Sequence, residues 1–474
     1  MQKADVSAWE ETAEDLHARL SDEYFRLEVG LSYSKGRIAS LERLNRQHAG
    51  VFLKNFSAPR ALFLDSIASV AKAKTFGLTL KLHELRKSKI CTRVGRTSVS
   101  WTTWRQFASH ASDAQRKSVF DAFIKKSGML TPTIDKFFRK SSGVYAAHGV
   151  DPLGVYLEDH HLTAAQLRNF LLTLGNSVKG MFRAEFRKYA KKFLQRSPAY
   201  YDDYYFMRNV VFSDMTDGFP VDSRDEVCKL LRDLGFDPRL IAVDDADRPS
   251  KYPSPFCSFV RIPHDVRVSY KPENPLQTAI ALYHEFGHAA HAITIDAGLP
   301  YHKRYVLSEG LTETFSIFLE NVLSDEDYLL QVLNLDKGYA RELVQRIRFT
   351  EHFAIAFYVA NSLLKMDQWE QNLSLKQMND HYSMHLKTWL GMDVPGEYWQ
   401  LHHILPESLM YVPSYLLAMA RAHELTELLK KEYGRWWWAN KRAGEELRAV
   451  MRPGADSKVG DFSTLDVASY VKSL

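Results

Sequence analysis

Tyr283-His-Glu-Phe-Gly-His-Ala-Ala-His291 is the stretch of sequence from which the rest of the chain can be interpreted. Upstream, Asn274 and Pro275 are typical of a helix cap and a first helical turn, and downstream Gly298 is typical of a helix stop. We therefore predict a helix of about 22 residues that contains the whole stretch near its middle.

His284 and His288 are spaced to hold one metal ion. About 3.6 residues per turn place both on one helical face, where each ring can reach an ion at roughly 2.0–2.1 Å. Glu285 is offset by one residue, so it can border a water on that ion as the general base. The pattern predicts one Zn²⁺ and metal-assisted hydrolysis. The alternative is a helix with satisfied histidines and a surface glutamate.

A tetrahedral zinc site needs a third protein ligand. The metzincin pattern does not supply it, because His291 and Thr294 stand where that pattern has glycine and histidine. A glutamate on a following helix is the other common solution, and residues 307–321 have a helical pattern with Ser308 as a plausible cap. Three glutamates fall on one stripe of that helix, and the residues alone do not choose among Glu309, Glu313 and Glu320.

The metal-binding stretch resembles the extended HEFGHxxH signature of the thimet oligopeptidase and oligopeptidase F family. Glu313 stands 29 residues after His284, the spacing of that family's glutamate ligand. Glu313-Thr-Phe-Ser-Ile-Phe-Leu-Glu-Asn321 resembles the family's E-x-P-S-Q-x-x-E-N segment and the E-S-Q-S-R-x-W-E-N segment of Taq-type metallocarboxypeptidases, which share the overall fold. The resemblance implies Glu313 as the third ligand. It also implies that His291 supports the metal site or faces the substrate, with simple packing as the alternative.

A second resemblance lies towards the C-terminus. The same oligopeptidases carry a histidine and, 12 residues later, a tyrosine followed by leucine, and His403 and Tyr415 keep that spacing. Where the family has a glycine-tyrosine pair this chain has Glu407-Ser408, and Met410-Tyr-Val-Pro-Ser-Tyr415 is more similar to the G-Y-F-P-S-Y of Taq-type carboxypeptidases. The resemblance implies that His403, Tyr415 and Tyr411 bind substrate and stabilise the oxyanion. Core packing is the alternative for both tyrosines.

Periodicity predicts a mainly α chain with a small β element. We predict an N-terminal helical region over residues 1–195, a mixed α/β segment over 196–271 and a helical catalytic region over 272–474. The strand signal is strongest in Phe256-Cys-Ser-Phe-Val-Arg-Ile and Val266-Arg-Val-Ser-Tyr. With the resemblance, this implies two helical lobes around a deep substrate cleft. The strand pair would edge the site and bind an extended peptide, or be an ordinary hairpin.

Two long helical runs are predicted in the N-terminal region. Residues 13–44 place apolar side chains at intervals of three and four, and residues 163–194 do the same before the Arg196-Ser-Pro-Ala turn. The pair His160–His161 follows two acidic residues and is expected at the surface rather than in a metal site.

Composition limits the partners. The three cysteines are far apart and form no disulfide framework, and the first residues lack the apolar run of a signal peptide, so we expect a cytoplasmic protein. A net charge of +5 on 474 residues says little about nucleic acid. Arg435-Trp-Trp-Trp mixes aromatic and basic residues, but packing between helices explains it better than nucleic acid or a membrane.

The residues together predict a zinc metalloendopeptidase of the oligopeptidase (gluzincin) type that cleaves short peptides. One rival, suggested by the Tyr411 segment, is a metallocarboxypeptidase that removes C-terminal residues. The other rival is a catalytically inactive zinc- and peptide-binding protein. The presence of Glu285 beside the ligands argues against that rival, because binding alone needs no general base.

Overall fold

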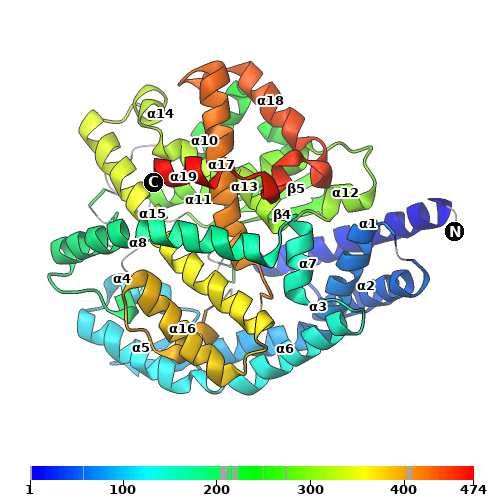
Figure 1. Cartoon of the computed structure of the whole chain (residues 1–474), viewed down its shortest axis with the longest axis horizontal. Helices are drawn as coiled ribbons and strands as arrows, with labels where there is room; N and C mark the ends of the chain where they lie inside the picture. Colours follow the sequence, from blue (N-terminus) through cyan, green and yellow to red (C-terminus); the bar gives the residue numbers. More distant parts are fainter. Residues whose placement is uncertain are drawn as a thin grey trace.

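The computed structural model describes residues 3–56, 58–202, 211, 212, 214, 215, 219, 222–248, 250–252, 254–272, 275–402 and 408–474. Helices dominate this part of the chain, which confirms the predicted mainly α fold (Figure 1). None of its described helices is both long and apolar enough to cross a membrane.

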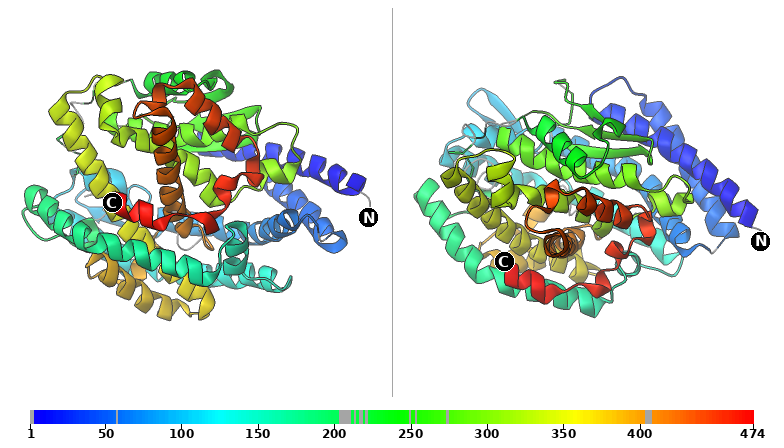
Figure 2. Two further views of the ribbon diagram at one scale, coloured as in Figure 1. Left: turned by 45° about the horizontal axis from the view of Figure 1, so that its top comes forward. Right: turned by 90° about the horizontal axis from the view of Figure 1, so that it is seen from above.

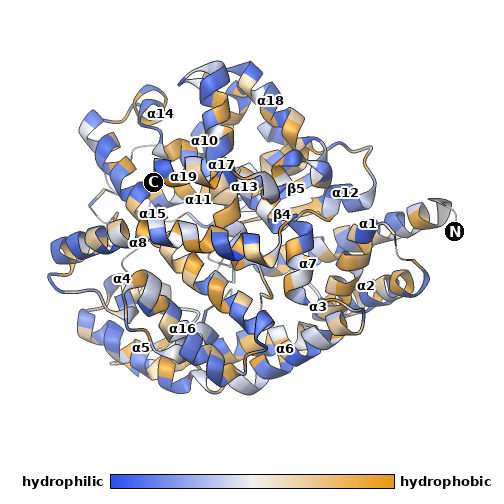
Figure 3. Cartoon of the chain, in the orientation of Figure 1, coloured by the Kyte–Doolittle hydropathy of each residue, from blue (hydrophilic) through white to orange (hydrophobic). Residues whose placement is uncertain are grey.

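The helices of the N-terminal part are α1 (Lys3–Glu28), α2 (Lys35–Asn55), α3 (Arg60–Ser88), α4 (Trp104–His110), α5 (Asp113–Ser127), α6 (Thr131–Ala146), α7 (Pro152–Asp159) and α8 (Ala164–Phe193). The later helices are α10 (Ser223–Asp233), α11 (Pro275–Thr294), α12 (Tyr301–Tyr305), α13 (Glu309–Glu320), α14 (Glu326–Gln331), α15 (Lys337–Glu370), α16 (Leu375–Leu390), α17 (Val412–Tyr433), α18 (Lys441–Met451) and α19 (Val467–Ser473). Figure 3 shows hydrophobic and hydrophilic residues mixed along most of them, as expected of helices that bury one face.

The predicted run over residues 163–194 is α8, and its first turn explains why it begins there. The Thr163 hydroxyl accepts the backbone N–H of Gln166, and the side-chain oxygen of Gln166 accepts the backbone N–H of Thr163. This capping box satisfies two backbone donors that a helix start leaves unpaired. The sequence therefore located this helix to within one residue at each end.

The run over residues 13–44 is two helices, α1 and α2, rather than one. Gly30 adopts a left-handed φ of 72° just after α1 ends, a conformation that favours glycine. Ser34 then caps α2 by accepting the backbone N–H of Arg37. Apolar periodicity continued across this turn, so the pattern alone concealed the break.

Three strands form the mixed sheet of the middle segment: β3 (Ile241–Asp244), β4 (Phe256–Arg261) and β5 (Asp265–Ser269). The predicted pair β4 and β5 is antiparallel, with Cys257 opposite Val268, whereas β3 joins β5 in parallel. In the order β3-β5-β4, β4 is an edge strand, and α1 and α11 pack against it (Figure 2). His17 of α1 lies 2.8 Å from the Phe259 carbonyl oxygen.

A second hairpin, β1 (Cys91–Val94) with β2 (Thr97–Ser100), interrupts the N-terminal helices and was not predicted. Its strands have four residues each, and Thr97 and Ser98 are exposed, so they carry little of the apolar alternation by which strands are recognised.

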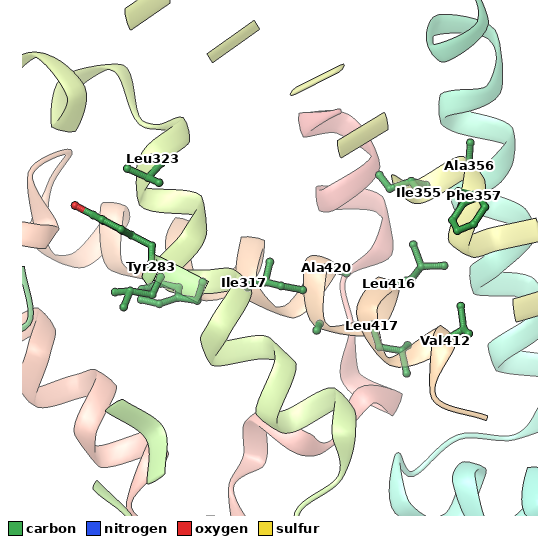
Figure 4. Packing of buried hydrophobic residues seen from close by; sticks show 14 of the residues in the cluster. Tyr283, Ile317, Leu323, Ile355, Ala356, Phe357, Val412, Leu416, Leu417 and Ala420 are labelled. Atoms are coloured by element: carbon green, nitrogen blue, oxygen red, sulfur yellow. The ribbon is translucent and has the colours of Figure 1, made fainter. Parts of the chain in front are cut away.

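The largest hydrophobic core connects the helices of the metal-binding stretch to α15 and α17. Figure 4 shows side chains of α17, such as Leu416 and Ala420, between Ile317 of α13 and Ile355 of α15. Trp437 packs against Phe318 of α13 at 5.1 Å between ring centroids, so the tryptophan cluster is in part a packing element, as expected. Helix α13 therefore packs against both α11 and α17.

Candidate metal centre

Helices α11 and α13 carry the predicted ligands. Helix α11 ends at Thr294, four residues before Gly298. Gly298 lies in the following turn, where its backbone N–H donates to Asp296 Oδ1. Its predicted cap, Asn274, lies outside the described residues. Helix α13 begins after Ser308, whose hydroxyl accepts the backbone N–H of Leu311 at 3.4 Å, as the sequence predicted.

Gly287 allows the two helices to approach closely. A Cβ atom at this position would lie 2.4 Å from the carbonyl oxygen of Phe315 and 2.6 Å from the Cα of Ser316. Both distances are shorter than a carbon side chain tolerates, so only glycine fits without moving a helix. The glycine between the two histidines of the motif therefore brings α13 against the face that carries them.

The approach brings His284, His288 and Glu313 together. Glu313 Oε2 lies 3.5 Å from His284 Nε2 and 3.7 Å from His288 Nε2, and one ligand atom from each of the three lies within 4.8 Å of the others. Bonds of about 2.0–2.1 Å at tetrahedral angles separate ligand atoms by roughly 3.3 Å. The donor set and its spacing thus fit one zinc ion with room for a fourth ligand.

Glu320 and Ser316 each contact one of these candidate ligands. Glu320 Oε2 lies 2.8 Å from His284 Nδ1, the ring nitrogen that faces away from the ion position. The Ser316 hydroxyl lies 3.1 Å from Glu313 Oε2 and also donates to the Glu313 carbonyl at 2.9 Å. A carboxylate behind a histidine ligand fixes its tautomer and raises its basicity. Of the glutamates on the predicted stripe, Glu320 therefore supports a ligand, and Glu309 lies outside the ligand group.

Glu285 lies beside the ligand group, and the pKa of its carboxyl group is raised above the usual value for glutamate. Burial, together with the carboxylates of Glu313 and Glu320, raises its pKa to about 7. His284 and the backbone N–H of Cys257 oppose that increase. A general base is most effective when its pKa lies near the working pH.

The two histidines differ in charge when no cation is present. Burial lowers the pKa of His288 to about 4, so its ring is neutral, as a ligand must be. Burial also lowers the pKa of His284, but the Glu320 hydrogen bond and the Glu313 and Glu285 carboxylates outweigh it and raise the pKa to about 10. A proton and a metal ion therefore compete for His284.

Tyr411 and Tyr415 line the site from α17 and the residue before it. The Tyr411 hydroxyl donates to Glu313 Oε1, and the Tyr415 ring lies 5.3 Å from the Tyr411 ring and stacks at 4.9 Å on Tyr358 of α15. Burial and Glu313 raise both pKa values well above the usual range for tyrosine, so both hydroxyls stay protonated donors. His403, the third residue expected here, lies outside the described residues.

His291 is a packing residue in this structure. Its side chain is fully buried and lies against Phe315, with 4.4 Å between ring centroids. Neither ring nitrogen has a hydrogen-bond partner among the described residues, and burial and His288 lower its pKa to about 3. The packing alternative thus describes it, rather than a role towards substrate.

His160 was expected at the surface, and that prediction was wrong. Its ring is fully buried and stacks on Tyr156 at 4.1 Å. Its Nε2 accepts the backbone N–H of Gly310 at 3.1 Å, which places α7 against the first turn of α13. The acidic residues before His160 suggested exposure, and no local signal reveals a partner 150 residues away.

The comparisons with known proteins agree with this architecture. No protein-family model matches the chain, and no curated protein matches its sequence. Among solved structures, metallocarboxypeptidase 1 of Trypanosoma cruzi matches with a TM-score of 0.61 over 98% of both chains, at 15% sequence identity. At that identity the likeness shows a shared fold over the whole chain, and the activity has to be argued from the site.

Proposed function

We propose that this protein is a zinc-dependent peptidase whose metal is held by His284, His288 and Glu313. The observation that carries the proposal is the convergence of these ligand atoms beside the Glu285 carboxylate. The fold shared with a protein described as a metallocarboxypeptidase supports it.

A zinc ion held by His284, His288 and Glu313 would supply a Lewis acid that could polarise a carbonyl oxygen and acidify water. Glu285 then accepts the proton of the attacking water and delivers it to the leaving amine. Tyr415 donates a hydrogen bond to the developing oxyanion, a task for which its neutral hydroxyl is suited. Glu320 keeps His284 in its ligand orientation during these proton movements.

The proposal also concerns which peptide bond is cleaved, an internal bond or the bond before the C-terminal residue. The sequence favoured endopeptidase action on short peptides. Carboxypeptidase action is a second candidate, favoured by the full-length fold likeness and by Tyr411, whose segment resembles that of Taq-type carboxypeptidases and whose hydroxyl reaches Glu313. The two candidates share the metal, the base and the oxyanion donors and differ in what they require of the substrate C-terminus.

The test is hydrolysis of a pool of short peptides, each made with a free and with an amidated C-terminus. The zinc-loaded protein, a chelated sample, Glu285→Gln and the exposed control Glu445→Gln would be compared by mass spectrometry. The proposal predicts cleavage by wild type and by the control, and none by Glu285→Gln although it still contains zinc. Loss of cleavage on amidation identifies a carboxypeptidase, and internal fragments from both peptide sets identify an endopeptidase.

Zinc binding without turnover across the whole pool would remove the peptidase proposal. It would leave a zinc- and peptide-binding protein as the better account.

A further inference from the structure

A second group of metal-ligating side chains lies where α15 meets α16, away from the residues described above. Asp367 stands near the end of α15, and His381 and His385 lie one turn apart on α16. Asp367 Oδ2 lies 3.1 Å from His381 Nδ1 and 2.8 Å from His385 Nε2. Two histidines four residues apart facing one carboxylate from another helix repeat the arrangement of the first site.

The other carboxylate oxygen of Asp367 forms an ion pair with an arginine. Arg168 of α8 donates to Asp367 Oδ1 at 2.9 Å and to Glu370 Oε2 at 2.6 Å. Helices α8 and α16 both pack against α15, so this arrangement joins three helices (Figure 1). Two carboxylates and one guanidinium leave one negative charge, and the histidines lie on the oxygen that Arg168 does not contact.

We propose that Asp367, His381 and His385 form a second binding site for a divalent metal ion of the zinc class. Two imidazoles and a carboxylate are the donor set that Zn²⁺ and its neighbours in the first transition row prefer. The His381 side chain is 25% exposed, which gives the ion an entry path and a water-accessible coordination position. The proposal does not depend on peptidase activity.

The short distances describe the metal-free state. At 2.8 and 3.1 Å the rings hydrogen-bond to Asp367, whereas ligands of a tetrahedral zinc lie roughly 3.3 Å apart. Binding therefore requires a small outward movement of each ring and a nitrogen lone pair turned towards the ion, with the displaced proton moved to the opposite nitrogen or to solvent. Both requirements, together with the charge of Arg168, make this site weaker than the first.

The position of the site indicates its effect. A bound ion would tie the end of α15 to α16 across the connection that ends at the Ser374 cap. Helix α15 also carries Tyr358, which stacks on Tyr415. The ion would therefore stabilise the helix pair behind the candidate oxyanion donor without contacting substrate.

The experiment is equilibrium dialysis of the full chain against micromolar Zn²⁺ at neutral pH, with metal content measured by plasma mass spectrometry. His284→Ala weakens the first site and isolates the second. The proposal predicts that His284→Ala still binds about one zinc per chain, and that adding His381→Ala removes it. Adding His83→Ala instead, an exposed histidine on α3, leaves binding unchanged.

Arg168→Gln provides a second measurement that keeps all three ligands. Removing the guanidinium raises the negative charge at Asp367, so zinc binding to His284→Ala/Arg168→Gln should tighten by about tenfold. Circular dichroism checks that each variant folds. The proposal is overturned if folded His284→Ala binds no second zinc, if His381→Ala leaves the binding unchanged, or if Arg168→Gln leaves the affinity unchanged or weakens it.

Discussion

The two histidine–carboxylate groups of this protein have similar ligands and different surroundings. At the first, Glu313 lies 3.5 and 3.7 Å from the histidine nitrogens, and its second oxygen accepts from the neutral Tyr411. At the second, Asp367 lies 2.8 and 3.1 Å from the histidines, and Arg168 contacts its other oxygen. In the first group the carboxylate oxygen and the histidine nitrogens are too far apart for good hydrogen bonds, so a cation can bind between them. In the second group the carboxylate already hydrogen-bonds to both histidines.

Helix packing explains the difference. At the first site Gly287 lets α13 approach α11 so closely that the ligands are fixed by backbone packing. At the second group Asp367 lies near the end of α15, and on α16 His385 is buried whereas the His381 side chain is 25% exposed. A rigid backbone can hold polar side chains at distances that they would not adopt on a flexible one. A catalytic metal site needs this preorganisation.

The largest expected effect is a loss of activity without a loss of zinc, which distinguishes the proposed general base from the proposed ligands. Glu285→Gln should lower kcat/KM by about 10²–10⁴-fold, because the amide cannot accept the proton of water. Zinc content should stay at the wild-type value, since Glu285 is not in the ligand group. Steady-state kinetics with metal analysis measures both quantities. A variant that has lost its zinc would contradict the assigned role.

Loss of the Tyr415 hydroxyl should have the next largest effect. Tyr415→Phe keeps the ring that stacks on Tyr358 and removes the donor, so kcat should fall by about 10²-fold with little change in KM. The matched control is Tyr252→Phe, which removes the hydroxyl of an exposed tyrosine and should remain near wild-type activity. An unchanged kcat in Tyr415→Phe, or an equal loss in both variants, would contradict oxyanion stabilisation by Tyr415.

Glu320 should affect the first site and not the second. Glu320→Gln removes the carboxylate behind His284, and we expect zinc affinity at the first site to fall by about 10–100-fold. Competition with a chromophoric chelator gives the affinity. Glu309→Gln, on the same helix but outside the ligand group, is the control and should change zinc affinity much less. An unchanged affinity in Glu320→Gln would show that the hydrogen bond does not tune the ligand.

The smallest expected effect is on stability. Burial alone would raise the pKa of Asp367, but hydrogen bonds from His385, Arg168 and His381 lower it to about 2 from its ordinary 3.8. The carboxylate therefore stabilises the fold above pH 3.8, and that stabilisation is lost as the pH falls through about 2. In chelated protein, Asp367→Asn should lower the free energy of unfolding by about 2 kcal/mol at pH 7.

Urea titrations at several pH values test this prediction. The difference between wild type and Asp367→Asn should shrink as the pH falls from 3.8 through about 2. Asp380→Asn, exposed on α16, should stay within about 0.5 kcal/mol of wild type throughout. A difference that grows as the pH falls below 3.8 would contradict the sign of the Asp367 pKa shift.

Much of the first site could be predicted because its signals are local. Capping residues and apolar periodicity located α8 and α13, and the spacing of His284 and His288 predicted that they share the side of α11 that faces Glu313. Strand propensity located β4 and β5 to within one residue at each end. The choice of Glu313 over Glu309 came from the family resemblance and not from the residues.

The remaining features depend on contacts between distant segments. The support of His284 by Glu320 and the contact of His160 with Gly310 arise from helix packing that no local pattern reveals. The spacing of His381 and His385 is visible in the sequence, but a pair of histidines carries meaning only once Asp367 is known to face it. Such pairs are common on exposed helices, so the structure was needed to single this one out.

The most direct test of the central claim is to follow peptidase activity while chelated protein is titrated with zinc. We expect activity to rise to its maximum at about one zinc per chain, and further zinc to fill the second site and raise the melting temperature without raising activity. Activity that persists in the fully chelated protein, or that stays absent when the first site is filled, would contradict the assignment of His284, His288 and Glu313 as the catalytic metal site.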